Sequence, residues 1–203
     1  MATVIDGTTG TSIAGASSTQ GAFTVNGALT ATGVITSSTG ALYPLVSGTV
    51  VTCAGQTSID FTGIPSTAKR ITVMFNGVSL SGSSSILVQL GTGTTTYTTT
   101  GYVGGGARFG ASSVAAATFT TGFAFNNATA AALIGGNMTI TNVTSNTWSA
   151  SGVCGENSGE FICMTGGSIP LAAVLTAVRV TTVNGTDTFD TTPSAGSINV
   201  MWE

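Results

Sequence analysis

Apolar and polar residues alternate in short runs through most of the chain. In residues 69–75, Ile71, Val73 and Phe75 alternate with more polar neighbours. Side chains two positions apart lie on one face of a strand, so this period predicts strands with one buried face. Runs of related character predict further strands over residues 46–51, 58–61, 85–90, 94–103, 114–125, 138–143, 147–154, 160–164, 172–183 and 197–202.

Glycine-rich signals separate the predicted strands. Asn76-Gly77 predicts a turn after residues 69–75, and the glycine cluster of residues 104–110, around Arg108, predicts a surface loop. Residues 126–132 predict a turn or one short helical turn. With no long helical period elsewhere, short strands at this spacing indicate an all-β head, an antiparallel β-sandwich of jelly-roll type.

A different pattern precedes this head. Residues 15–40 repeat every six residues, and the third position is apolar in three successive units, at Phe23, Leu29 and Ile35. Because six is even, these side chains return to the same face of an extended chain. The units open with glycine, which permits turns and close backbone approach, at Gly15, Gly21, Gly27 and Gly33.

Three interpretations of the repeat compete. A left-handed β-helix usually needs more than these four units, and a flexible linker needs no regular apolar positions. The third is an extended, intertwined β stem of identical chains, with Phe23, Leu29 and Ile35 on a shared axis, and we favour it. Tyr43-Pro44 predicts an extended junction, which assigns the stem to residues 15–43 and the head to residues 44–203.

Residues 1–14 hold few apolar side chains. Val4, Ile5 and Ile13 would anchor a peptide that attaches to another protein, and we assign the segment this role. Terminal segments are also often disordered, so both interpretations stay open.

Charged residues are scarce. They make up 5% of the 203 residues, against about 25% in an ordinary soluble domain. Four basic residues cannot neutralise a track of phosphates, so we expect no nucleic-acid partner. A net charge of −3 and a mean hydropathy of +0.46 indicate that much of the surface is hidden between subunits.

Targeting signals are not evident. The first basic residue is Lys69, so no basic region of a signal peptide is recognisable. The most apolar run, residues 171–178, is too short to span a bilayer. We therefore expect synthesis in a cytoplasm and no membrane insertion.

The three cysteines are Cys53, Cys154 and Cys163. Cys154 and Cys163 are expected on facing strands of one hairpin, and all three are expected to be small buried residues with reduced thiols. Because the chain has no histidine and no paired CxxC motif, we expect no zinc site.

Catalytic chemistry finds little support. There is no histidine base, and the single lysine, Lys69, adjoins Arg70. Two carboxylate pairs, Asp187 with Asp190 and Glu156 with Glu160, lack the aromatic residues of a sugar-cleaving cleft. We expect no enzyme, no catalytic residue and no cofactor.

Residues 184–190 offer oxygen ligands for calcium, but the DxDxDG order is absent, so we favour a turn and expect no metal.

The few charged residues suggest ion pairs. Asp60 with Arg70 is predicted as a cross-strand pair, and Arg179 is predicted to meet an acidic residue of a neighbouring subunit. Four residues are candidates for contacting a ligand: Tyr97, Tyr102, Arg108 and Trp148. Each of them would also fit in a core or an interface.

Several stretches resemble virion proteins of tailed bacteriophages. AFTVNGALTATGVITSSTG resembles repeats that precede the heads of tail fibres and spikes, and ATVIDGTTG resembles the N-termini of fibre and structural proteins. FTGIPSTAKRITVMFNGVS and the ending GSINVMWE resemble a C-terminal β-sandwich module of phage tail proteins.

The resemblance implies a homotrimer in the virion. Its N-terminal peptide would attach to another virion protein, and a short intertwined stem would carry jelly-roll heads that bind a host-surface polysaccharide or protein. Two alternatives stay open. The first is a head fibre, collar or decoration protein of the capsid with a mainly structural role, and the second is a polysaccharide-degrading spike.

Overall fold

The computed structural model describes residues 35–37, 40–42, 44–126, 129–130, 132–157, 161–191 and 195–203. The chain divides into two units, Met1–Leu42 and Tyr43–Glu203. In the first unit, β1 (Ile35–Ser37) pairs antiparallel with β2 (Gly40–Leu42). The other predicted stem and attachment residues lie outside the described residues: Phe23, Leu29, Val4, Ile5 and Ile13.

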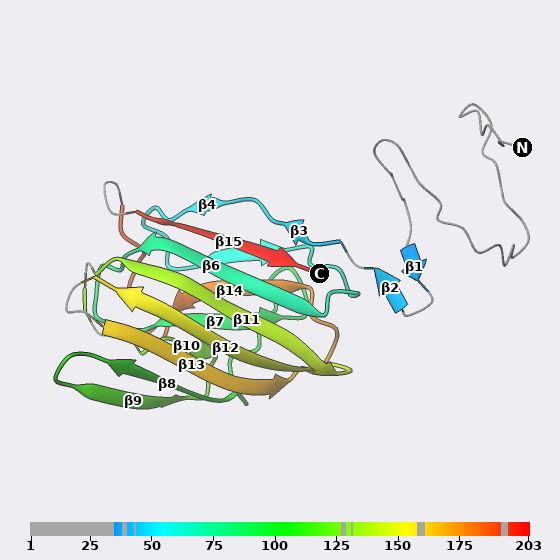
Figure 1. The fold of residues 1–203 in the computed structure, drawn as a ribbon. Coiled ribbons are helices and arrows are strands. Elements are labelled where there is room, and N and C mark those ends of the chain that lie inside the picture. Colours follow the sequence, from blue (N-terminus) through cyan, green and yellow to red (C-terminus); the bar gives the residue numbers. More distant parts are fainter. Residues whose placement is uncertain are drawn as a thin grey trace, which may run out of the picture. The chain divides into compact units, whose positions relative to one another are not determined.

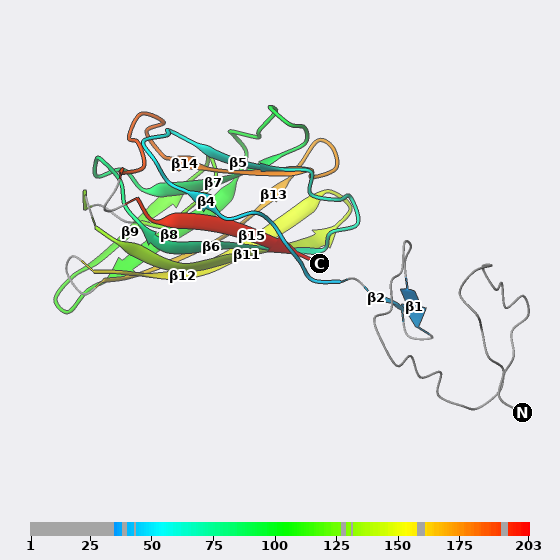
Figure 2. The same cartoon turned by 90° about the horizontal axis from the view of Figure 1, so that it is seen from above.

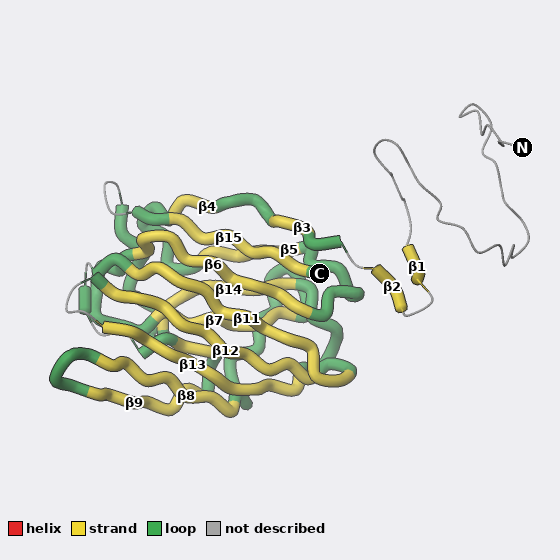
Figure 3. The backbone as a smooth tube through the Cα atoms, viewed as in Figure 1, coloured by secondary structure: helices red, strands yellow, loops and turns green. Residues whose placement is uncertain are grey.

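The second unit is all-β. Every strand pair described in it is antiparallel, and Figure 3 shows strands and loops with no helix in the described part of the chain. The strands form two sheets. The smaller, in spatial order, contains β10 (Phe123–Ala124), β7 (Ile86–Gly91), β14 (Ala177–Thr182) and β5 (Ile59–Thr62).

The larger sheet contains nine strands among the described residues, with β4 (Val51–Thr52) beside β15. In spatial order the other eight are β3 (Val46–Ser47), β15 (Ser197–Trp202), β6 (Arg70–Val78), β11 (Ile134–Thr144), β12 (Thr147–Glu156), β13 (Phe161–Pro170), β8 (Val103–Phe109) and β9 (Val114–Phe119) (Figure 1).

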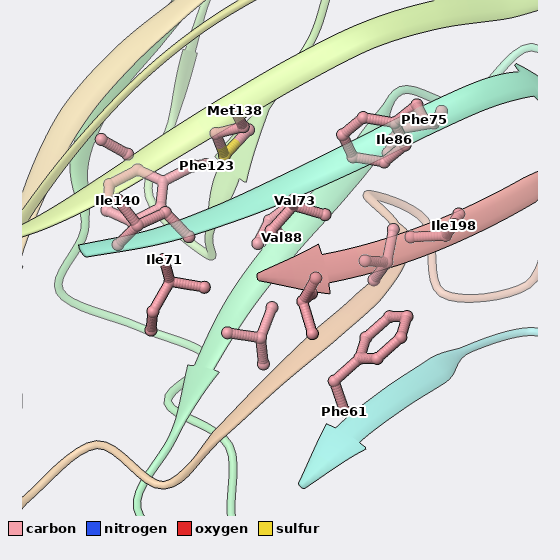
Figure 4. Close-up of a cluster of buried hydrophobic side chains, with 14 of the residues drawn as sticks. Phe61, Ile71, Val73, Phe75, Ile86, Val88, Phe123, Met138, Ile140 and Ile198 are labelled. Carbon is pink, nitrogen blue, oxygen red and sulfur yellow. The ribbon is translucent and has the colours of Figure 1, made fainter. Parts of the chain in front are cut away.

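The two sheets lie in separate layers, with β5, β7 and β14 on one side and β15, β6, β11 and β12 on the other (Figure 2). Their facing side chains form one hydrophobic core. The arrangement is consistent with a β-sandwich, in which inward residues of both sheets interdigitate. Residues that Figure 4 labels in this core include Phe61, Val88, Val73, Ile140 and Ile198.

The alternation in the sequence identifies the buried faces correctly. Ile71, Val73 and Phe75 are buried on β6, and Ile198 and Val200 are buried on β15. On β7 both faces are buried, because Leu87 packs outside the main core in a small cluster with Phe119 and Ala124.

The predicted loop at residues 104–110 is wrong. Residues 103–109 form β8, which pairs with β13 on one side and β9 on the other. Glycine allows close approach here, since a Cβ on Gly106 would lie 2.6 Å from the carbonyl oxygen of Ala124. Clustered glycines usually indicate a loop, whereas here the absence of a side chain lets the segment around Ala124 pack directly against the strand.

The turn predicted at Asn76-Gly77 is also wrong. β6 continues to Val78, and its register with β11 shifts between Gly136 and Ile134, so the glycine lies in a bulge. Gly77 has a φ of 63°. Turns and bulges both require such a positive φ, and the dipeptide alone does not distinguish them.

Two predicted strands are broken or absent. Residues 94–102 form a loop whose only strand-like contact is a bridge from Tyr97 to Gly91. Residues 114–125 split into β9 and β10, so Phe119 does not share the main core with Phe123 and Phe125. No helical turn is present in the described part of residues 126–132.

The cysteine prediction is confirmed. Cys154 on β12 lies opposite Cys163 on β13, and these two and Cys53 are buried and free of disulfides. The adjacent Cys163 thiol and burial together raise the pKa of Cys154, and burial raises the pKa of Cys53 to about 11. The raised pKa values keep the thiols of Cys53 and Cys154 protonated and unreactive, as expected of structural cysteines.

Candidate functional site

The outward face of the smaller sheet carries a polar cluster. Val178 and Val180 on β14 point into the core, so Arg179 between them lies on the opposite face. In register, Arg179 is flanked by Asp60 on β5 and by Gln89 on β7. The backbone pairing of three strands therefore brings these polar side chains together.

Arg179 and Asp60 form a two-point ion pair. Nε of Arg179 donates to Oδ1 of Asp60 at 2.7 Å, and Nη2 donates to Oδ2 at 2.8 Å. Both side chains are 31% exposed. The hydrogen bond to Asp60 raises the pKa of Arg179, so the guanidinium group keeps its charge.

This pair bears on two predictions. Asp60 does not pair with Arg70, which forms an ion pair with Glu203 instead. Arg179 has an acidic partner, Asp60, within its own chain. The reason is topological: β5 and β6 belong to different sheets, whereas β5 and β14 are adjacent.

Tyr97 covers the guanidinium group. The Cζ atom of Arg179 lies 4.0 Å from the centroid of the Tyr97 ring, a cation–π contact. The loop after β7 brings the ring to Gly91, where a Cβ would lie 2.9 Å from it. Burial and then the negative charge of Asp60 raise the pKa of Tyr97 to about 12.

Two polar depressions flank the ion pair. One, of about 370 Å³, includes Arg179 and Gln89, and the other, of about 360 Å³, includes Asp60 and Trp202. Their further linings are rich in hydroxyl groups, with Thr57, Ser58, Thr99, Thr121, Thr181 and Thr182 in the first and Ser47, Thr49 and Thr62 in the second. We call the ion pair, Tyr97 and the two depressions the polar surface.

The chemistry of the polar surface suits a hydroxylated, uncharged ligand. Its planar guanidinium and carboxylate groups form directional hydrogen bonds, and Tyr97 and Trp202 add aromatic surface. Among the described residues, no group of three or more Cys, Asp or Glu side chains is placed to hold a metal ion.

The four predicted ligand contacts do not come together. Tyr102 and Trp148 are only 2% and 4% exposed and belong to the core, so a ligand at the surface does not reach them. Arg108 lies on β8, with its Cζ 4.8 Å from the Phe161 ring centroid. Only Tyr97 lies on the polar surface.

Sequence reasoning missed Asp60, Gln89, Arg179 and Trp202 as site residues. The available signal was a charged residue inside an apolar strand, at Arg179 between Val178 and Val180. Its partners could not be found from the sequence, because the register that joins them is between strands far apart in the chain.

Residues 184–187 form a turn capped by the side chain of Asn184, and Phe189 forms a β-bridge to Leu80. Oδ1 of Asn184 accepts from the N–H groups of Thr186 and Asp187, both at 3.1 Å. Oδ2 of Asp187 accepts from the N–H of Ser84 at 2.9 Å, and Ser79 donates to Asp190 at 2.5 Å. These oxygen atoms already have partners within the chain.

Comparison of the chain with protein families, curated proteins and solved structures gave no match. In the described residues, no helix has the length and apolar character needed to cross a membrane.

Proposed function

We propose that this chain is a structural protein of a tailed-bacteriophage virion, a homotrimeric fibre or spike whose head binds the host surface. In this proposal residues 15–43 form the intertwined stem, residues 1–14 attach to another virion protein, and the head is a jelly-roll-like β-sandwich. The supports are the resemblance of the repeat to fibre sequences, the antiparallel all-β head and the scarcity of charge.

The polar surface is the observation that carries the receptor-binding role. A surface polysaccharide presents many hydroxyl groups and few apolar ones, which matches depressions lined with threonine, serine, Gln89 and the Arg179–Asp60 pair. Polar groups held rigidly by an ion pair need little reordering on binding. We therefore propose a host polysaccharide as the ligand, bound without being cleaved.

The test is binding of the purified full-length protein to susceptible host cells and to polysaccharide extracted from them. Arg179→Gln should weaken binding roughly tenfold or more, since about 1.4 kcal/mol of lost interaction suffices. The matched control is Arg70→Gln, which removes an ion-paired arginine of the larger sheet. It should bind as the unchanged protein does.

Two results would oppose the proposal. Equal binding by both variants and the unchanged protein would show that the polar surface does not bind the host ligand. The absence of saturable binding to any susceptible strain would remove the receptor-binding role altogether.

A structural role as a head fibre, collar or decoration protein is the second candidate. It is favoured by the internal pairing of the same polar groups, since Asp60 binds Arg179 and Gln89 donates to the carbonyl oxygen of Thr121 at 2.9 Å. Immunogold electron microscopy of intact particles separates the two roles. Gold at the tail tip supports receptor binding, and gold over the capsid or collar supports the structural role.

A further inference from the structure

The outward face of the larger sheet is apolar at one end. Side chains of β12, β13, β8 and β9 that point away from the core include Val153, Ile162, Met164, Phe109 and Val114, which are between 42% and 68% exposed. The only charged residues on these strands and on β11, Glu156 and Arg108, lie in register with inward-facing residues, so the outward positions carry no charge. We call this surface the apolar face.

The apolar face is continuous across the strands. Val153 lies opposite Met164, and Met164 lies opposite Ala107 on β8. Ile162 lies opposite Phe109, which in turn lies opposite Val114 on β9. Because adjacent strands are about 4.8 Å apart, these side chains form two neighbouring apolar rows.

Hollows lie on the same face. Depressions of about 430 Å³ and about 460 Å³ both include Gly105 and Gly166, where no side chain fills the surface. The first is rimmed by Phe109 and Met164, and the second by Val103. One face therefore presents both protruding apolar side chains and apolar hollows, so one part of it can fit against another part on the next copy, as in the head-to-tail contact of a ring.

The size of the face also fits a subunit interface. Four strands at about 4.8 Å and seven residues at about 3.4 Å give roughly 450 Å² in projection, more than half of the roughly 800 Å² per partner in stable interfaces. On a single chain, an apolar patch of this size is often a functional contact surface. At its edge, β9 also lacks the lysine and proline that usually protect a free strand (Figure 1).

We propose that the apolar face is the contact between heads, packed against further copies of this chain. The inference rests on the proposed homotrimer and adds to it the surface through which the heads associate. We expect another copy of the chain to bind here because the face carries no charge that would attract an ionic partner. The face also carries both the apolar side chains and the apolar hollows that such a contact brings together.

The experiment is thiol labelling of the full-length protein. Val153→Cys places a thiol on the apolar face, and the control, Val174→Cys, places one in the loop before β14. The two valines are 49% and 46% exposed in the single chain, and the native cysteines are buried, so background labelling is low. Each maleimide rate is divided by the rate of the same variant in denaturant, and light scattering of the same samples gives the mass.

We expect an oligomer in which the thiol of Val153→Cys reacts roughly tenfold or more slowly than that of Val174→Cys. An oligomer with equal rates at both sites would overturn the proposed contact and leave the fibre proposal standing. A monomer with equal rates would overturn the contact and the homotrimer together.

Discussion

At the scale of single residues, the two tyrosines near β7 show how context decides a role. Tyr102 is in the core, where its hydroxyl oxygen accepts the N–H of Leu90 at 2.8 Å and its ring meets Phe123 edge-on. Tyr97 stacks on Arg179, and among the described residues its buried hydroxyl has no hydrogen-bond partner. The same residue type therefore accepts a hydrogen bond from a buried backbone N–H in one place and packs on a surface ion pair in the other.

Tyr102→Phe should destabilise the protein by about 1–3 kcal/mol, because it leaves the buried N–H of Leu90 without a partner. Tyr97→Phe is the matched control and should change the free energy of unfolding by less than about 0.5 kcal/mol. Urea denaturation followed by fluorescence measures both. Equal losses in the two variants would contradict the assignment of the Leu90 hydrogen bond.

The pH dependence of stability provides a second residue-scale prediction. Burial raises the pKa of Tyr102 to about 12, from 10.0 in the unfolded chain. The folded state therefore keeps a proton that the unfolded state loses, so this contribution is complete below pH 10 and is lost as pH rises through about 12. The unfolding free energy should fall over this range, and less steeply in Tyr102→Phe, in urea titrations at several alkaline pH values.

At the scale of elements, glycine positions determine how the strands of the larger sheet bend and approach one another. Gly136 on β11 lies at the register shift against β6 and has a φ of 154°. A Cβ there would lie 2.3 Å from the carbonyl oxygen of Val153. Gly155, on the neighbouring strand β12, has no atom within 4 Å of a Cβ position.

Gly136→Ala should therefore cost about 3 kcal/mol or more, from the strained backbone and the clash together. Gly155→Ala should be neutral or stabilise by up to about 1 kcal/mol, since it restricts only the unfolded chain. Thermal unfolding of the two variants beside the unchanged protein measures the difference. Similar melting temperatures for both would show that the bulge tolerates a side chain.

At the scale of the whole molecule, the proposed homotrimer depends on the repeat of residues 15–40. Its apolar third positions would bring Leu29 from three chains to one axis. Charge is scarce enough that association through apolar surfaces is not opposed by repulsion, with a net charge of −3 on 203 residues.

Leu29→Asp should dissolve the trimer, because a charge buried in three copies costs several kcal/mol per ion. Thr30→Asp is the matched control, since the next residue of an extended chain points to the other side. Light scattering of the full-length proteins measures the mass. Trimers in both variants would show that Leu29 is not on the axis, and a monomeric unchanged protein would contradict the stem.

The sequence by itself determined which stretches form most of the strands and which faces are buried. It also indicated facing strands for Cys154 and Cys163, because a hairpin between adjacent strands is a local property, and the structure gives their exact register. Only the tertiary structure decided that Gly104–Gly106 belong to a strand, that Asn76-Gly77 forms a bulge and that Arg179 pairs with Asp60. Alternation depends on neighbouring residues in the sequence. Strand pairing and the close approach of two backbones depend on segments that are more than a hundred residues apart, such as β5 and β14.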